Sequence, residues 1–274
     1  MRKKFSTILL GILCLMLLSI GCSSTKEEEK KEEEPQYADD SFVQDMSKGL
    51  QARWDLNAID EQKEGYDEIL VNSKEYQDMM ISYIDAELNE IEKYAEEKFE
   101  NKNLQEIAIK YINLLEKHKE ICDYITVDYD KYYGEFEPIY NERSKVIESM
   151  VKDYGMTVDE EHQSILDDFL TNSQLVKDQE SKQNAINSML QNIQFQEVTD
   201  DGFGWRTYQA VVENTTGIDF KTLQININLL DADWVIVETT YDQVSSFNNG
   251  AKVQFEFSTD KEFVTTQVTS DWWE

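Results

Sequence analysis

Apolar residues recur every three or four positions along the chain from about residue 39 to residue 194. This spacing places them on one face of an α-helix. It predicts helices over 42–54, 76–95, 104–125 and 129–151, and further helical stretches over 165–169 and 185–193. Long helical patterns, few glycines and short connections favour an antiparallel, up-and-down helical bundle over 37–194.

Local signals mark the ends of several of these helices. Asp40-Ser41 precedes the first apolar pattern and is expected to cap that helix, and residues 157–160 have the form of a capping box. Pro138 lies inside the 129–151 pattern. Proline lacks a backbone N–H and its ring clashes with the preceding turn, so we expect a kink or a break near Glu137. Gly155 is expected to end this helix.

The pattern changes at about Phe195, where alternation with a period of two replaces the helical spacing. Residues 210–217 predict a strand that ends in a turn, and apolar residues alternate with polar ones over 223–229. Turns are expected at 231–233 and at 248–250, each followed by a further strand. Short strands at this spacing predict a small antiparallel β-sandwich, Ig-like, over 195–274. The expected fold class is therefore α+β, with the helical bundle first.

The first 36 residues have a different character. A basic head, Met1–Lys4, precedes an apolar run over 5–20, and Gly21 and Cys22 follow it. This order is typical of an export signal, and the run is short for a membrane span. Residues 22–36 are rich in Glu and Lys, so we expect a signal peptide over 1–21 and a charged tether over 22–36.

The end of this signal resembles the lipobox of bacterial lipoproteins. The residues that carry the resemblance are Leu18-Ser19-Ile20-Gly21-Cys22, with Ser19 where the motif usually has Leu. The resemblance implies cleavage after Gly21 and a diacylglyceryl group on the Cys22 thiol. It also implies a location on the extracytoplasmic face of the cell membrane. The alternative is an ordinary secretory signal followed by an unrelated cysteine.

The strand region resembles a second family, the FxLYD domain of bacterial surface proteins. Residues 213–216 (Glu-Asn-Thr-Thr), residues 227–231 and the Asn-Gly turn carry the resemblance, with Ile227 in place of Phe and Leu230 in place of Tyr. The motif consists of strand and turn residues. The whole layout is similar to lipoproteins of low-GC Gram-positive bacteria, which implies a fold and a location but no activity.

Charge narrows the possible partners. The chain has 56 acidic and 26 basic residues, and its formal net charge is −30. Binding to nucleic acid or to anionic lipid headgroups requires clustered Lys and Arg, so this balance argues against both. A hydrophobic content of 40% is sufficient for a packed core.

Few residues are candidates for catalysis or metal binding. With Cys14 in the signal and Cys22 expected to carry lipid, Cys122 remains, and it is expected to be a small buried hydrophobe. His118 precedes Cys122 by four positions, which would permit two zinc ligands, but no further His or Cys completes a site. His162 is expected in the first turns of a solvated helix.

Acidic clusters and nucleophile motifs give no stronger candidate. Residues 128–133 begin like a calcium loop but carry Tyr133 where glycine is required. The acidic pairs at 200–201 and at 231 and 233 are expected at turns, where Asp accepts local backbone N–H groups. The sequence has no Gly-x-Ser-x-Gly elbow and no P-loop. We therefore expect no catalytic, metal or cofactor site.

Aromatic residues could form contact surfaces. Tyr129, Tyr132 and Tyr133 are expected to pack within the bundle, and the alternative is a contact patch near Pro138. Trp272 and Trp273 could complete the sandwich or mark a docking strand.

These observations favour a non-enzymatic binding or interaction module at the cell envelope, whose partner is an envelope protein or a cell-wall component. One alternative is the solute-binding lipoprotein of a transporter. Segregated helices and strands and only ten glycines argue against it, because such receptors usually need alternating βαβ units around a cleft. Another alternative is a wall-active hydrolase that uses two of the many carboxylates.

Overall fold

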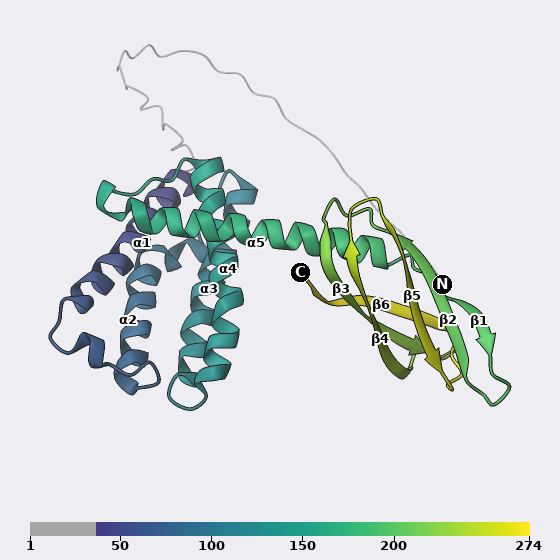
Figure 1. Ribbon diagram of the computed structural model, residues 1–274. Coiled ribbons are helices and arrows are strands. Elements are labelled where there is room, and N and C mark those ends of the chain that lie inside the picture. Colours follow the sequence, from purple (N-terminus) through teal and green to yellow (C-terminus); the bar gives the residue numbers. More distant parts are fainter. Residues whose placement is uncertain (1–36) are drawn as a thin grey trace, which may run out of the picture. The chain divides into compact units, whose positions relative to one another are not determined.

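The computed structural model describes residues 37–274 (Figure 1), so the predicted signal peptide and tether lie outside the described residues. Five helices come first and six strands follow, which confirms the α+β fold class. The helices are α1 (Asp39–Glu61), α2 (Lys74–Ile91), α3 (Lys102–Ile121), α4 (Tyr129–Tyr154) and α5 (Gln163–Leu190). The strands are β1 (Gln196–Asp200), β2 (Arg206–Glu213), β3 (Phe220–Leu230), β4 (Ile236–Phe247), β5 (Lys252–Thr259) and β6 (Thr265–Trp273).

The helical part encloses its own hydrophobic core. Side chains from α1 to α4 and from the first turns of α5 fill it, and Phe42 lies edge-on to Tyr94 and Phe99. Gly49 of α1 lets the backbones of α1 and α2 approach closely, because a Cβ there would lie 2.9 Å from the backbone oxygen of Glu87. The apolar spacing thus predicted the buried faces correctly.

Both predicted N-terminal caps are wrong. Helix α1 begins after Ala38, which makes no side-chain cap, and the Asp39 carboxylate accepts the backbone N–H groups of Glu100 and Asn101 at 2.9 Å. Residues 157–160 do not form a capping box. The Thr157 carbonyl accepts the Ser47 hydroxyl at 2.6 Å, and a 3₁₀ turn over 160–162 precedes α5. In both places a tertiary contact replaces the local cap.

A kink or a break is expected near Glu137, and helix α4 continues through Pro138 without a break. Proline removes the hydrogen bond to the carbonyl of the residue four positions earlier, which is Gly134. Pro138 and Gly134 are both exposed, so water can solvate that carbonyl. The helix ends as predicted at Gly155, which has a left-handed backbone with φ 70°.

The strands form two antiparallel three-stranded sheets, β1-β2-β5 and β4-β3-β6. Their inner faces pack together, and alternate residues of β3 (Leu223, Ile225, Ile227 and Leu229) are fully buried. Both expected turns join consecutive strands: 231–233 joins β3 to β4 within one sheet, and 248–250 joins β4 to β5 of the other sheet. Asn214, from the segment that carries the family resemblance, is buried and donates to the carbonyls of Ile218 and Phe247 at 2.7 and 2.8 Å. That segment therefore serves the packing of the sandwich.

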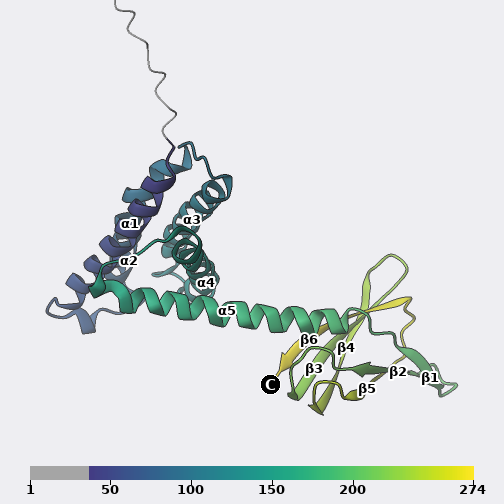
Figure 2. The ribbon, with the colours of Figure 1, turned by 90° about the horizontal axis from the view of Figure 1, so that it is seen from above.

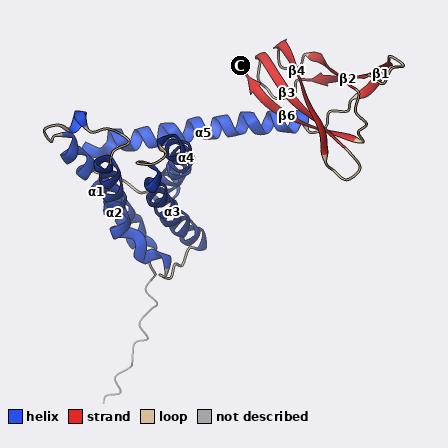
Figure 3. Cartoon of the chain, turned by 90° about the horizontal axis from the view of Figure 1, so that it is seen from below, coloured by secondary structure: helices blue, strands red, loops and turns tan. Residues whose placement is uncertain are grey.

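Helix α5 is a single helix where the sequence pattern predicts two separate stretches (Figures 2 and 3). Its first turns place Leu166 and Phe169 in the helical core, whereas its last turns place Ile186 and Leu190 in the core of the strands. One element thus belongs to both cores.

Candidate functional site

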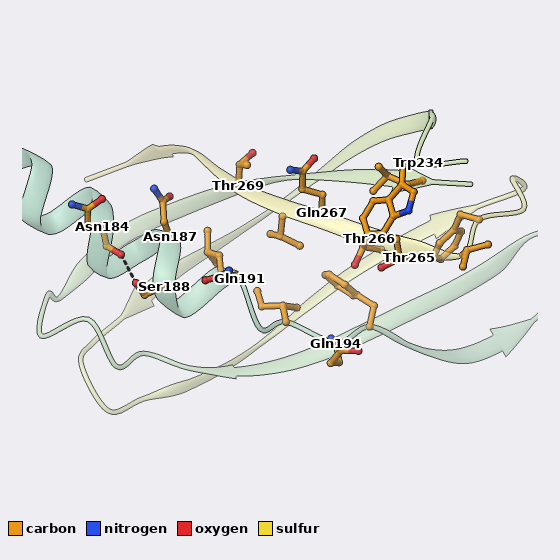
Figure 4. Close-up of a pocket in the computed structure, with 17 residues that line it drawn as sticks. Asn184, Asn187, Ser188, Gln191, Gln194, Trp234, Thr265, Thr266, Gln267 and Thr269 are labelled. Carbon is orange, nitrogen blue, oxygen red and sulfur yellow. Dashed lines mark hydrogen bonds between the residues drawn. The ribbon is translucent and has the colours of Figure 1, made fainter. Parts of the chain in front are cut away.

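A groove of about 890 Å³ lies between the last turns of α5, strand β6 and the β3–β4 turn (Figure 4). At one end α5 meets β6, where the Gln183 amide donates to the Ser270 hydroxyl at 2.6 Å. The groove is lined by β6 on one long side and by α5 with the segment after it on the other.

The α5 side presents four polar residues: Asn184, Asn187, Ser188 and Gln191. Their spacing of three and four positions puts them on one helical face. The neighbouring apolar residues of the same turns are buried in the strand core, which fixes this polar face toward the groove. The Ser188 hydroxyl donates to the Asn184 carbonyl at 2.8 Å.

The strand side is lined by seven consecutive residues, 263–269. Successive residues of a strand point to opposite faces of the sheet. A pocket on one face would therefore be lined by every second residue, so this groove runs along the edge of β6. Among the described strands β6 pairs only with β3, and its other edge opens into the groove.

Trp234 stands over the groove from the β3–β4 turn (Figure 4). Its side chain is 75% exposed, and its φ of 62° lies in the left-handed region. That conformation costs a non-glycine residue about 1–2 kcal/mol. The Asp231 carboxylate holds the turn by accepting the N–H groups of Asp233 and Val235 at 2.9 and 3.0 Å. The turn thus holds the Trp234 indole in an unfavourable backbone conformation, and packing of the exposed side chain offsets little of that cost.

None of the 17 lining residues is charged or titratable, although 30% of the chain consists of Asp, Glu, Lys and Arg. The lining instead offers amides and hydroxyls, which both donate and accept hydrogen bonds, among apolar side chains such as Phe195 and Phe263. Such a surface suits an uncharged ligand with its own donors and acceptors.

The predicted lipidation site provides no evidence for or against the groove. Cys22 and the cleavage position Gly21 lie outside the described residues. Cys122 is fully buried as expected, and burial raises the pKa of its thiol to about 12. Its Sγ donates to the His118 carbonyl at 3.2 Å, so the two side chains do not converge as ligands. Burial also lowers the pKa of His118 well below its usual value and keeps the ring neutral.

The expectation of a solvated His162 is wrong. The residue lies in the 3₁₀ turn before α5, but it is only 6% exposed and packs against the Trp54 ring. Its Nε2 lies 2.8 Å from Asp55 Oδ1, and its Nδ1 lies 3.2 Å from Gln51 Oε1. These contacts with α1 bury His162. Its acidic neighbours in the sequence had indicated a solvent-exposed position.

Three of the four acidic turn residues, Asp200, Asp201 and Asp231, behave as predicted. Asp231 accepts backbone N–H groups within its own turn, and so do Asp200 and Asp201. Asp128 caps α4 by accepting the N–H of Lys131 at 3.1 Å. These carboxylates satisfy local backbone donors.

The tyrosines do not form a common contact patch. Tyr132 is buried and stacks near His118 and Phe136, whereas Tyr133 on the next position of α4 is 59% exposed. Both terminal tryptophans lie in β6: Trp273 packs edge-on to Phe220, and Trp272 remains exposed. Trp273 therefore helps to complete the sandwich, whereas Trp272 does not.

The helical core contains a buried charge cluster that the sequence does not reveal. Glu87 accepts from Arg143 Nη2 at 2.7 and 3.0 Å, from Arg53 Nη1 at 3.0 Å and from the Tyr111 hydroxyl. Burial alone would raise the pKa of Glu87, but the two guanidinium groups outweigh it and hold this pKa below its usual value. Every oxygen of the carboxylate is occupied, so this cluster holds α1, α2, α3 and α4 together.

The groove residues were missed in the sequence because each is ordinary in isolation. Two signals were present. The run 263–269 has no charge in a highly charged chain, and Trp234 occupies a turn position that usually carries Gly.

No described helix has the length and apolar character needed to cross a membrane. Within 37–274, no group of three or more His, Cys, Asp or Glu side chains is arranged to hold a metal ion. Comparison of the chain with family models, with curated proteins and with solved structures finds no match.

Proposed function

We propose that this protein is a non-enzymatic binding module of the cell envelope. Lipidated Cys22 would anchor it to the extracytoplasmic face of the membrane, and the groove between α5 and β6 would bind the partner. The observation that carries the proposal is the groove itself: a built, uncharged surface with an exposed tryptophan in a chain of net charge −30.

Trp234 offers a way to separate binding from folding. Glycine adopts a φ of 62° without strain, so Trp234→Gly should leave stability unchanged or raise it by about 1 kcal/mol. Replacing a residue that is needed for folding would lower the stability instead. Ser246, with a φ of 57°, lies outside the lining, and Ser246→Gly is a matched control.

The test is in-cell cross-linking of a tagged full-length chain, followed by mass spectrometry of the captured material. We expect one dominant envelope component with the parent chain and with Ser246→Gly. Capture should be lost with Trp234→Gly and with the unanchored Cys22→Ala chain. Equal capture by all four chains would refute the proposal.

A further inference from the structure

The geometry points to one kind of occupant for the groove. We propose that it binds an extended polypeptide segment of a partner protein, which pairs through its main chain with the free edge of β6. This inference rests on the proposed function and names the class of partner for the same groove.

The direction of the groove supports pairing with a strand. Residues 263–269 line it without interruption, so an occupant lies along the edge of β6 and meets the outward N–H and C=O groups there. Five of these residues, 265–269, belong to β6, and five residues of extended chain span about 17 Å. A peptide of similar length would form a fourth strand on the sheet β4-β3-β6, with main-chain hydrogen bonds as the source of affinity.

The edges of β1 and β4 carry features that protect against such pairing, and the β6 edge does not. Strand β1 carries Glu197 and Asp200 and has an irregular register after Glu197. On β4, the Asp242 carboxylate accepts the N–H of Glu256 from β5 at 2.7 Å. Charges and bulges are the usual means by which proteins prevent edge pairing. The β6 edge has neither along 265–269.

The walls of the groove restrict what can pair. Helix α5 and the segment after it line the side of the groove opposite β6, so an occupant of the β6 edge also contacts α5. A second copy of the chain is a poorer occupant, because its β6 edge is accompanied by its own α5, which would have to fit beside the groove as well. The lining combines apolar residues such as Val268 with exposed polar ones such as Gln267. The matching segment is uncharged and combines apolar residues with hydroxyl or amide residues.

The experiment selects binders from random displayed peptides of about seven to ten residues on the full chain. Amide hydrogen exchange then locates the selected peptides. At a peptide concentration about ten times the Kd, exchange of outward N–H groups in 265–269 should slow about tenfold. N-methylation of one alternating set of peptide residues should weaken binding by about tenfold or more, because it removes the donors of the pairing edge.

A charge on the β6 edge provides the protein variant. Gln267→Lys should abolish binding, because it introduces the protection that the other edges have. Gln243→Lys, the same change at an exposed position of β4 in the same sheet, should leave it unchanged. Retention of secondary structure in both chains by circular dichroism shows that the loss is local.

Each other outcome overturns the inference in a distinct way. Peptides that protect residues outside the groove, or that tolerate both N-methylated sets, would exclude strand pairing. If purified wall glycan fragments alone perturb 263–269, the polypeptide inference fails and the proposed function stands. A dimer of the chain that Gln267→Lys dissociates would assign the edge to a second copy. No effect of peptides or of glycans on the groove would remove both proposals.

Discussion

Neutralising Glu87 should strongly destabilise the helical part. The side chain is fully buried, and in Glu87→Gln the guanidinium groups of Arg143 and Arg53 lose their anionic partner. The three hydrogen bonds from arginine are worth about 1.5–3 kcal/mol each, or roughly 5–9 kcal/mol together. The glutamine oxygen retains part of this, and breaking a buried pair typically costs about 3–5 kcal/mol. We expect a loss in that range.

Urea unfolding of the full chain, followed by circular dichroism at the helical band, measures this loss. Asp85→Asn is the matched control on the same helix, since its pair with Lys119 is 40% and 45% exposed. It should cost less than about 1 kcal/mol. The double variant Glu87→Leu, Arg143→Met should be more stable than Glu87→Gln, because it leaves one guanidinium group, that of Arg53, without its anionic partner instead of two. Either of two results would refute the conclusion that this cluster holds the bundle together. One is a loss below about 1 kcal/mol for Glu87→Gln. The other is that the free-energy losses of Glu87→Leu and Arg143→Met, measured singly, add up to the loss of the double variant.

Further predictions concern packing, pH, the strand core and the groove. Gly49→Ala should cost about 1–3 kcal/mol in urea unfolding because its Cβ meets the Glu87 backbone, whereas Gly134→Ala, with open space around it, should gain about 0.5–1 kcal/mol. Burial opposes ionisation of Glu148, but Lys152, Lys177 and Ser173 hold its pKa at about 2, below the ordinary 4.5. The resulting stabilisation of about 3 kcal/mol is present above pH 4.5 and is lost as the pH falls toward 2, so Glu148→Gln should flatten the acid limb of a stability–pH curve. Asn214→Ala leaves two carbonyls without their donor and should cost roughly 2–4 kcal/mol, whereas exposed Thr215→Ala should change thermal stability by less than about 0.5 kcal/mol. Peptide affinity at the groove should change less than about twofold between ~0.05 and ~0.5 M salt in a titration, because no charge lines the groove.

The sequence was sufficient for the elements and their buried faces. Helical spacing predicted the core positions of α1 to α4, and alternation over 223–229 predicted the buried face of β3. These patterns are periodic and local, and burial follows directly from them. The two separate stretches at 165–169 and 185–193 were joined in one helix because the polar residues between them suppress the apolar signal without breaking the helix.

Features set by distant residues could not be predicted in the same way. The predicted cap residues Asp40 and Ser41 lie inside α1, because the helix already begins at Asp39, whose carboxylate accepts backbone N–H groups more than 60 positions away. His162 is buried by residues of α1. The groove depends on α5 lying beside β6, about 80 residues later in the chain, and on which sheet edge remains free. Neither follows from local pattern, so the uncharged run 263–269 alone did not identify one side of a groove.

The most direct test of the account places a photoreactive residue at Gln267, in the groove, or at Gln243, on the opposite edge of the same sheet. Both full-length chains are irradiated in cells, and the cross-linked products are identified by mass spectrometry. The account predicts one polypeptide adduct from position 267, joined through an uncharged segment, and no such adduct from position 243. Adducts of equal yield from both positions, or an adduct from 243 alone, would contradict it.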